Sequence, residues 1–595
     1  MKKTFIHILA ILASVLALAS CEKFLDTVSY TERNTSNFPA SEEDAMQLVT
    51  GIYSAMIGPI TNSPGTNFYI MLANMCSDDA FGGGGSGDIA AQAMDHFMTD
   101  NMERQKNLWT YDYKGIGRAN MALANLDKVE DENLRNQLIG EALTMRSYYY
   151  FELAQVFEEV PLLTTVPQNV SEATDYPAAA SVDEIYGFMA ASLKKAIEIM
   201  PSTPFGSIMT GRNHVSKWVA EGLLARIFLF YTGFYSDKLG KPIDTLPVMD
   251  LETGEMTSET ISRQYVADKL ADCIQNSGFK LLEDYRMLWS YSNVYTQKDY
   301  PFVQDMVAKK LSWAKDGENP EQMFSICCAE VKDFYNQVAL YNGLRIQKTP
   351  GPYVDIFPLT RGYGFAPIST GLWNEWEAAE PTDIRRMGSI YNIYKESTNL
   401  SSYEYGADKQ MEETGLWQKK VQAFACYLDG KWIFESTSGS EYYGTGSDFG
   451  RKKCPTDITL MRFADILLMH SELTQTADGL NKVRARAGLP PVAYSTEALR
   501  NERRWEFAME GLRWGDMRRY GKAYCTSALE KQLGHKIWNE GKETVMKDQG
   551  SGYKARYEKT WGFRPYPQSE VDLSNGVLTQ KSGWDSTDSQ YTGWK

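Results

Sequence analysis

The sequence has few cysteines and fewer histidines, with 8 and 5 respectively in 595 residues. The cysteines form no CxxC pair, and the seven that follow Cys21 are irregularly spaced. An odd number with irregular spacing disfavours both a disulfide framework and a cysteine-based zinc site. The histidines after the first twenty residues form no HExxH motif and no short pair, which argues against a zinc enzyme. They are His96, His214, His470 and His535.

Other catalytic signatures are missing as well. There is no GxSxG nucleophile elbow. The run from Gly82 to Gly87 is followed by Asp88, where a phosphate loop would have Lys and then Ser or Thr. Zinc, nucleophile-elbow and phosphate-loop enzymes are therefore disfavoured, and we expect no metal and no cofactor. Two alternatives stay open, because Asp78, Asp79 and Asp88 offer oxygen ligands of the kind that Ca²⁺ prefers, and a glycoside hydrolase needs only two suitably spaced carboxylates.

Positive charge and long apolar runs are scarce too. The net charge is −15, and it becomes −15 − 2 = −17 if Lys2 and Lys3 are removed with an N-terminal signal. This acidic balance argues against nucleic acid as a partner. Apolar runs beyond the first twenty residues are short and contain charges, as Arg226 does in the run from Gly222 to Phe230. A transmembrane helix would need about 20 consecutive apolar residues.

The N-terminus has the layout of a secretory signal. Lys2 and Lys3 precede an apolar run from Phe5 to about Leu18, and the small residues of Leu18-Ala-Ser-Cys21 follow. This ending resembles the lipobox of bacterial lipoproteins, which implies cleavage before Cys21 and acylation of its thiol. We therefore expect residues 1–20 to be a signal peptide and lipid on Cys21 to anchor the chain to a membrane.

Helical periodicity dominates both ends of the remaining chain. Ser41 and Ser181, each with an acid three residues later, are typical helix N-caps. Apolar residues then recur at spacings of three and four, which predicts helices. The expected helices are 109–129, 134–157, 181–200, 216–235, 458–474 and 496–520. Because several follow one another with short connections, we predict a mainly α-helical fold built on TPR-like helix pairs.

Residues 238–455 differ from the rest in being rich in glycine, proline and aromatic residues, with weak periodicity. Long irregular segments in a compact protein are usually functional or disordered, and the aromatic content argues for function. We expect 21–237 and 456–595 to pack as one helical domain and 238–455 to be an irregular, aromatic-rich ligand-binding portion. Residues 77–88 are expected to form a solvated, flexible acidic loop.

The most informative stretch runs from Leu499 to Tyr520 and reads LRNERRWEFAMEGLRWGDMRRY. We interpret it as part of one helix with Met509 on its apolar face. Glu506 and Glu510 could be mistaken for a catalytic acid pair, but arginines within helical reach favour structural ion pairs. The stretch resembles the ERRxEFxxEGxRxxDLxRW helix of the SusD/RagB family of outer-membrane lipoproteins.

Other motifs match the same family in the same order along the chain. Ile384 stands where the family usually has proline, and Lys581 and Trp584 depart from its closing element. The resemblance spans nearly the whole chain after Cys21, so the sequence is identified as a member of the SusD/RagB family. The matching segments are Trp109 to Asn120, Gly140 to Leu162, Ala220 to Arg226, Asp383 to Arg386, Met461 to Leu489 and Pro565 to Gln580.

The resemblance implies a cell-surface binding protein of Bacteroides-type bacteria that is not an enzyme. Such proteins cover a SusC-like TonB-dependent transporter, capture oligosaccharides and pass them to the barrel; some members bind peptides. We expect an oligosaccharide or polysaccharide ligand, a SusC-like partner and an outer-membrane location through the lipid on Cys21. A peptide ligand and an exported glycoside hydrolase remain the alternatives.

Sugar binding has simple chemical requirements. Apolar faces of sugar rings stack on Trp and Tyr, and hydroxyls exchange hydrogen bonds with acids and arginines. Within 238–455, Arg361, Tyr363 and Trp373 offer such groups in glycine-containing segments, and the acidic loop adds Asp78 and Asp79. We predict that these residues contact the ligand.

Overall fold

The computed structural model describes residues 38–167, 175–208, 214–314, 318–328, 337–345, 358–359, 362–397, 403, 409–422, 424–428, 431–434 and 456–595. The expected signal peptide, Cys21 and Arg361 lie outside these residues. In the described part of the chain, no helix has both the length and the apolar character that crossing a membrane requires.

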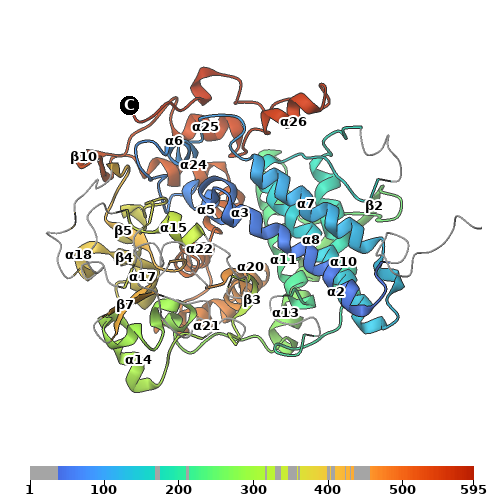
Figure 1. Cartoon of the computed structure of the whole chain (residues 1–595), viewed down its shortest axis with the longest axis horizontal. Coiled ribbons are helices and arrows are strands. Elements are labelled where there is room, and N and C mark those ends of the chain that lie inside the picture. Colours follow the sequence, from blue (N-terminus) through green and yellow to red (C-terminus); the bar gives the residue numbers. More distant parts are fainter. Residues whose placement is uncertain are drawn as a thin grey trace, which may run out of the picture.

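Long helices form a layer on one side of the molecule, the right side of Figure 1. They are α2 (Glu42–Tyr53), α7 (Lys106–Leu123), α8 (Glu132–Phe157), α10 (Val182–Ile199), α11 (Lys217–Phe230) and α13 (Arg263–Asn276). Helix α8 packs against both α7 and α10, and α10 packs against α11. Ser41 and Ser181 cap α2 and α10 as expected, the latter with a full capping box. The predicted mainly helical fold is confirmed.

The remaining helices have at most 12 residues. They are α3 (Ile57–Thr61), α4 (Pro64–Asn67), α5 (Tyr69–Met75), α6 (Ile89–Asp95), α12 (Ser236–Lys238), α14 (Gln304–Lys309), α15 (Gln337–Asn342), α16 (Thr370–Ala379), α17 (Ile384–Ser389), α18 (Ile393–Glu396), α20 (Phe463–Thr474), α21 (Asp478–Arg486), α22 (Thr496–Glu506), α23 (Arg513–Arg519), α24 (Lys522–Glu530), α25 (Tyr553–Thr560) and α26 (Gln568–Leu573). The C-terminal helix α23 packs against the early helix α5, and Tyr553 of α25 donates a hydrogen bond to Asp95 of α6; α5, α6 and α25 lie in the upper part of Figure 1.

Strands are short and pair only in twos within the described residues. The antiparallel pairs are β1 (Thr245–Met249) with β2 (Met256–Ser262), β3 (Gln322–Ile326) with β8 (Ile458–Arg462), β4 (Ile390–Asn392) with β5 (Leu416–Gln418), β6 (Ala425–Leu428) with β7 (Lys431–Phe434), and β9 (Lys536–Asn539) with β10 (Lys542–Val545). In the β4–β5 pair Tyr391 lies opposite Trp417. Each pair joins only its own two strands, and no pair of the described residues extends into a larger sheet.

One hydrophobic core joins both ends of the chain, from Ala45 in α2 to Leu578 near the C-terminus. A second core lies within the portion that the sequence marked as irregular, and its members are largely aromatic. They include Tyr285, Trp289, Tyr291, Tyr300, Tyr391, Trp417 and Phe424. Much of the aromatic content of 238–455 therefore serves packing.

The beginning of 238–455 is more regular than expected. Strand β1 packs against α10, and α13 packs against α11 and α20 in the helical layer. Residues 245–276 therefore pack with the helical layer. The boundaries of the remaining domain division stay a prediction.

The predicted single helix 496–520 is wrong. The chain leaves α22 after Glu506 and enters α23 at Arg513, with Met509 and Gly511 at φ angles of +64° and +76°. The buried side chain of Asn74 donates a hydrogen bond to the Met509 carbonyl at 3.0 Å and accepts one from the Gly511 amide at 3.0 Å. This bridge replaces the helical hydrogen bonds and stabilises the break. The predicted helix 458–474 likewise begins as strand β8.

Candidate ligand-binding site

Asp78 and Asp79 are buried, with 5% and 1% of their surface exposed. Arg513 donates to both oxygens of Asp78, at 2.7 and 2.8 Å, and Arg504 Nε donates to Asp79 at 2.8 Å. Burial alone would raise the pKa of Asp78, but Arg504 and Arg513 hold it below its usual range. The expectation that these two acids face solvent is wrong, because arginines of α22 and α23 draw them into the core.

Trp373 is also buried, with 5% of its surface exposed. The guanidinium of Arg386 and the ammonium of Lys395 each lie 5.0 Å from the centroid of its ring. Glu377 pairs with both cations, at 3.3 and 2.8 Å. The two cations and Glu377 therefore surround the buried ring of Trp373. The ring does not offer the open flat face that the sequence predicted.

The glycine-rich run meets the segment that contains Tyr363. The Gly84 amide donates to the Gly364 carbonyl at 2.7 Å, and the Ala366 amide donates to the Gly82 carbonyl at 3.1 Å. Gly82 to Gly85 are buried, so the predicted solvated, flexible loop is wrong for these residues. Gly83 has a φ of +67°, and a Cβ there would lie 2.3 Å from Pro367. Glycine is needed for this close backbone approach.

We use the name Gly-rich face for the half-buried side chains of Tyr341, Arg345, Tyr363 and Asp88, which lie beside the buried glycines 82–85. Half-buried Tyr341 and Tyr363 lie there with ring centroids 5.3 Å apart. Arg345 Nη1 donates to Asp88 Oδ2 and to the Tyr363 carbonyl, both at 3.1 Å. The structure thus brings together the two segments that the sequence marked as candidate binding segments, and places two phenol rings beside an acid and a guanidinium.

Tyr341 and Arg345 were not predicted. Tyr341 belongs to the short helix α15, which packs against α3 and α4, and Tyr341 contacts Phe365 with centroids 4.7 Å apart. No spacing in the sequence connects these residues to the glycine run. Only the chain fold places them at one surface.

Two further segments support the Gly-rich face from below. The Met411 amide donates to the Gly84 carbonyl at 2.8 Å, and the Gln410 side chain donates to the Gly364 carbonyl at 2.9 Å. The hairpin of β9 and β10 contacts the loop 409–413, because the Glu413 amide donates to the Trp538 carbonyl at 3.0 Å. This backing fixes the position of the polar and aromatic groups.

The calcium alternative gains no support from the geometry. Asp78 and Asp79 accept from arginines, as described above, and Asp88 accepts from Arg345 and from the Gly85 amide at 2.7 Å. Arginine therefore occupies the place that a cation would take at each of these carboxylates.

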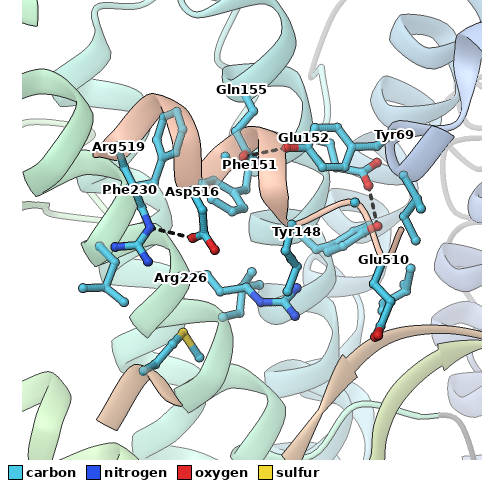
Figure 2. Close-up of a pocket in the computed structure, with 18 of the residues that line it drawn as sticks. Tyr69, Tyr148, Phe151, Glu152, Gln155, Arg226, Phe230, Glu510, Asp516 and Arg519 are labelled. Carbon is cyan, nitrogen blue, oxygen red and sulfur yellow. Dashed lines mark hydrogen bonds and ion pairs between the residues drawn. The ribbon is translucent and has the colours of Figure 1, made fainter. Parts of the chain in front are cut away.

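A half-open cavity of about 80 Å³ lies between the helical layer and α23 (Figure 2). Arg226 pairs with Asp465 at 2.7 Å, and Tyr69 donates to Gln155 at 2.6 Å. A cavity of about 150 Å³ holds one benzene, so this one suits a few waters and not a sugar. Burial raises the pKa of Glu152 on its wall to about 7.

An open depression of about 310 Å³ lies beside α22 and α23. The rings of Phe228, Tyr494 and Tyr520 line it, and the guanidinium carbons of Arg500 and Arg519 lie 4.2 and 4.6 Å from the Tyr520 ring centroid. Those cation–π contacts already use the Tyr520 ring. We take the Gly-rich face as the candidate site because it contains Tyr363, which the sequence predicted to contact the ligand.

The chain was compared with known proteins. Residues 23–229 match a SusD-like family described as "Starch-binding associating with outer membrane", and residues 374–584 match the SusD family. A SusD-like protein of Bacteroides ovatus is 21% identical, covering 96% of this chain and 97% of its own.

Two solved structures have the same fold. One is a SusD homolog from Bacteroides thetaiotaomicron, with a TM-score of 0.65 and 20% identity over 93% of this chain and 99% of that one. The other is surface glycan-binding protein A from Bacteroides thetaiotaomicron in complex with laminarihexaose, with a TM-score of 0.64 and 18% identity over 91% and 99%. The two family matches, which together cover residues 23–229 and 374–584, show that the chain belongs to the SusD/RagB family.

Proposed function

We propose that this chain is a surface glycan-binding lipoprotein that captures oligosaccharides and delivers them to a SusC-like TonB-dependent transporter. The observation that carries the proposal is the convergence of the glycine-rich run with the Tyr363 segment. It places Tyr341 and Tyr363 beside the Asp88–Arg345 ion pair at one surface.

The chemistry of this surface suits a sugar. The apolar C–H faces of a pyranose ring pack on phenol rings, while its hydroxyls hydrogen-bond to a carboxylate and a guanidinium. Asp88 and Arg345 hold each other in place, so little ordering of side chains is needed when a ligand binds. Tyr363 stays in the proposed site on these grounds, and Arg361 stays as a prediction from the sequence.

Asp78, Asp79 and Trp373 are left out of the proposed contacts. Their side chains are buried, and all three make ion-pair or cation–π contacts within the protein. A ligand could reach them only by breaking those contacts.

The lipid anchor and the transporter rest on sequence and family. The ending Leu18-Ala-Ser-Cys21 supports acylation, and the SusD-like family that matches 23–229 is described as associating with the outer membrane. Delivery to a SusC-like barrel is the role that the family resemblance implies.

A ligand screen tests the proposal. Purified chain starting after Cys21 is titrated calorimetrically with a panel of oligosaccharides that includes laminarihexaose, the ligand of one structural relative. We expect saturable binding of at least one glycan that is recovered intact after long incubation. Recovery of shortened glycan would indicate a hydrolase, and binding of peptides alone would indicate the peptide-binding alternative; either result contradicts the proposal.

A further inference from the structure

Asp95, His96 and Glu412 form a buried cluster where α6 ends, close to α25 (Figure 1). His96 Nε2 lies 3.6 Å from Glu412 Oε1 and 4.0 Å from Asp95 Oδ2. The candidate ligand atoms of the three residues all lie within 4.8 Å of one another. None of the three residues is more than 1% exposed.

Several polar atoms of the cluster have no partner in the described part of the chain. Both ring nitrogens of His96 and Oε1 of Glu412 are buried without a hydrogen bond. The other oxygen of Glu412 accepts from the Gly83 amide at 2.8 Å, and Asp95 accepts from the Tyr553 hydroxyl at 3.2 Å. Buried polar groups are nearly always satisfied, so an imidazole nitrogen and a carboxylate oxygen that face each other need a third species between them.

The charges of the cluster point to a cation. No lysine or arginine of the described residues pairs with Asp95 or Glu412, whose only ion-pair partner among those residues is His96. The acids near α22 differ in this respect, because Glu506 pairs with Arg385 and Arg462 at 2.9 and 2.8 Å. Burying two carboxylates without compensation is costly.

We propose that Asp95, His96 and Glu412 bind a divalent transition-metal ion, of which Zn²⁺ is the representative. Tetrahedral metal–ligand bonds of about 2.0–2.2 Å place two ligands of one ion about 3.3–3.6 Å apart. The His96–Glu412 distance of 3.6 Å fits this spacing, and Asp95, at 4.0 Å from the same nitrogen, has to move closer when the ion binds. The imidazole favours a transition metal over Ca²⁺ or Mg²⁺, which prefer oxygen ligands alone. Water completes the coordination.

The site is structural. The rings of Tyr553, Tyr591 and Trp594 lie 5.1, 6.0 and 6.0 Å from the His96 ring and screen it from bulk water. The ion joins the end of α6 to the loop 409–413, and through Gly83 it reaches the base of the Gly-rich face. Because Glu412 is far from His96 in sequence, no motif spacing reveals this site.

Metal content and affinity test the proposal. The chain after Cys21 is purified with a tag that lacks histidine, stripped with a chelator and titrated with Zn²⁺. We expect one equivalent per chain, a higher melting temperature on Zn²⁺ addition and a Co²⁺ complex with visible absorption. His96→Gln and Glu412→Gln should each weaken Zn²⁺ binding by more than roughly 100-fold, beyond the effect of losing an outer-shell partner. His470→Gln, which changes a half-buried histidine of α20, is the matched control.

Glu412→Gln keeps an acceptor for the Gly83 amide, so it separates metal binding from folding if His96→Gln folds poorly. The proposal is overturned if wild-type protein binds no stoichiometric Zn²⁺. It is also overturned if Glu412→Gln binds Zn²⁺ and Co²⁺ as wild type does. A wild-type chain whose melting ignores Zn²⁺, while Glu412→Gln melts higher, would show that a shared proton and not a metal balances the acids.

Discussion

Arg513 and Asp78 form a two-pronged ion pair, with nitrogen–oxygen distances of 2.7 and 2.8 Å, that joins α23 to the segment after α5. Both residues are at least nine-tenths buried. The pair connects the C-terminal family segment to the N-terminal part of the chain. Asp78 and Asp79 therefore connect the N-terminal part of the chain to α22 and α23. These ion pairs also fix the start of the glycine run at 82–87.

Asp78→Ala should destabilise the protein by about 3–5 kcal/mol, because it leaves Arg513 buried without its carboxylate. The denaturant midpoint measures this loss. Glu543→Ala, which removes an exposed surface pair with Lys536, should change stability by less than about 1 kcal/mol. If Asp78→Ala has normal stability but has lost glycan binding, Asp78 contacts the ligand and the structural role proposed for it is wrong.

Gly511→Ala tests the break between α22 and α23. Gly511 has a φ of +76°, and a Cβ would lie 2.8 Å from the Cα of Ile70. We expect a loss of about 2–4 kcal/mol from backbone strain and overpacking combined. Gly534→Ala has a similar φ of +82° but no neighbour within 4 Å, so it should cost only about 1–2 kcal/mol. Equal costs in thermal or denaturant unfolding would show that the contact with Ile70 is unimportant.

Glu152→Gln tests the cavity of Figure 2 through pH. Burial raises the pKa of Glu152 to about 7, above its ordinary value of 4.5. Since the folded state binds this proton more tightly, the contribution of Glu152 to stability is greatest below about pH 4.5 and is lost as pH rises through 7. The neutral glutamine should remove about 1–3 kcal/mol of that loss.

The measurement for Glu152→Gln is the melting temperature between pH 5 and pH 8. The variant should gain on wild type as pH rises, while the exposed Glu198→Gln should follow wild type throughout. A difference between Glu152→Gln and wild type that does not change with pH would mean that Glu152 titrates normally.

Cys21→Ala should release the protein from membranes. The reason is that the ending Leu18-Ala-Ser-Cys21 provides a single thiol for acylation, and several acyl chains anchor firmly at about 0.8 kcal/mol per buried CH₂. Membrane fractionation after labelling with a radioactive fatty acid measures both the acylation of the chain and its release from the membrane. A labelled membrane pool of unchanged size in the variant would refute lipidation at Cys21.

Helix starts and buried helix faces could be predicted from the sequence, because they depend on residues close together in the chain. The hydroxyl of Ser181 followed by Glu184 predicted the N-terminus of α10, and the structure has that capping box. The three-and-four spacing after Ser181 predicted a buried helix face, and Ile185, Phe188 and Leu193 are almost fully buried.

Features set by distant contacts could not be predicted in the same way. The break after Glu506 depends on Asn74, which is remote in sequence. Charge and glycine content suggested a solvated loop at 77–88, but arginines of α22 and α23 neutralise its first acids and the backbone of Gly364 covers its glycines. The meeting of Tyr341, Tyr363 and Arg345 likewise depends on the fold of the whole chain.

The most direct test of the account is calorimetric titration of Tyr363→Ala with the glycan that the screen identifies. Loss of one stacked ring should cost about 1–3 kcal/mol, or roughly tenfold to a hundredfold in Kd. Trp373→Ala, matched in kind but buried under Arg386 and Lys395, should leave Kd unchanged in whatever protein stays folded. Wild-type affinity in Tyr363→Ala, with the loss appearing in Trp373→Ala, would contradict the assignment of the ligand to the Gly-rich face.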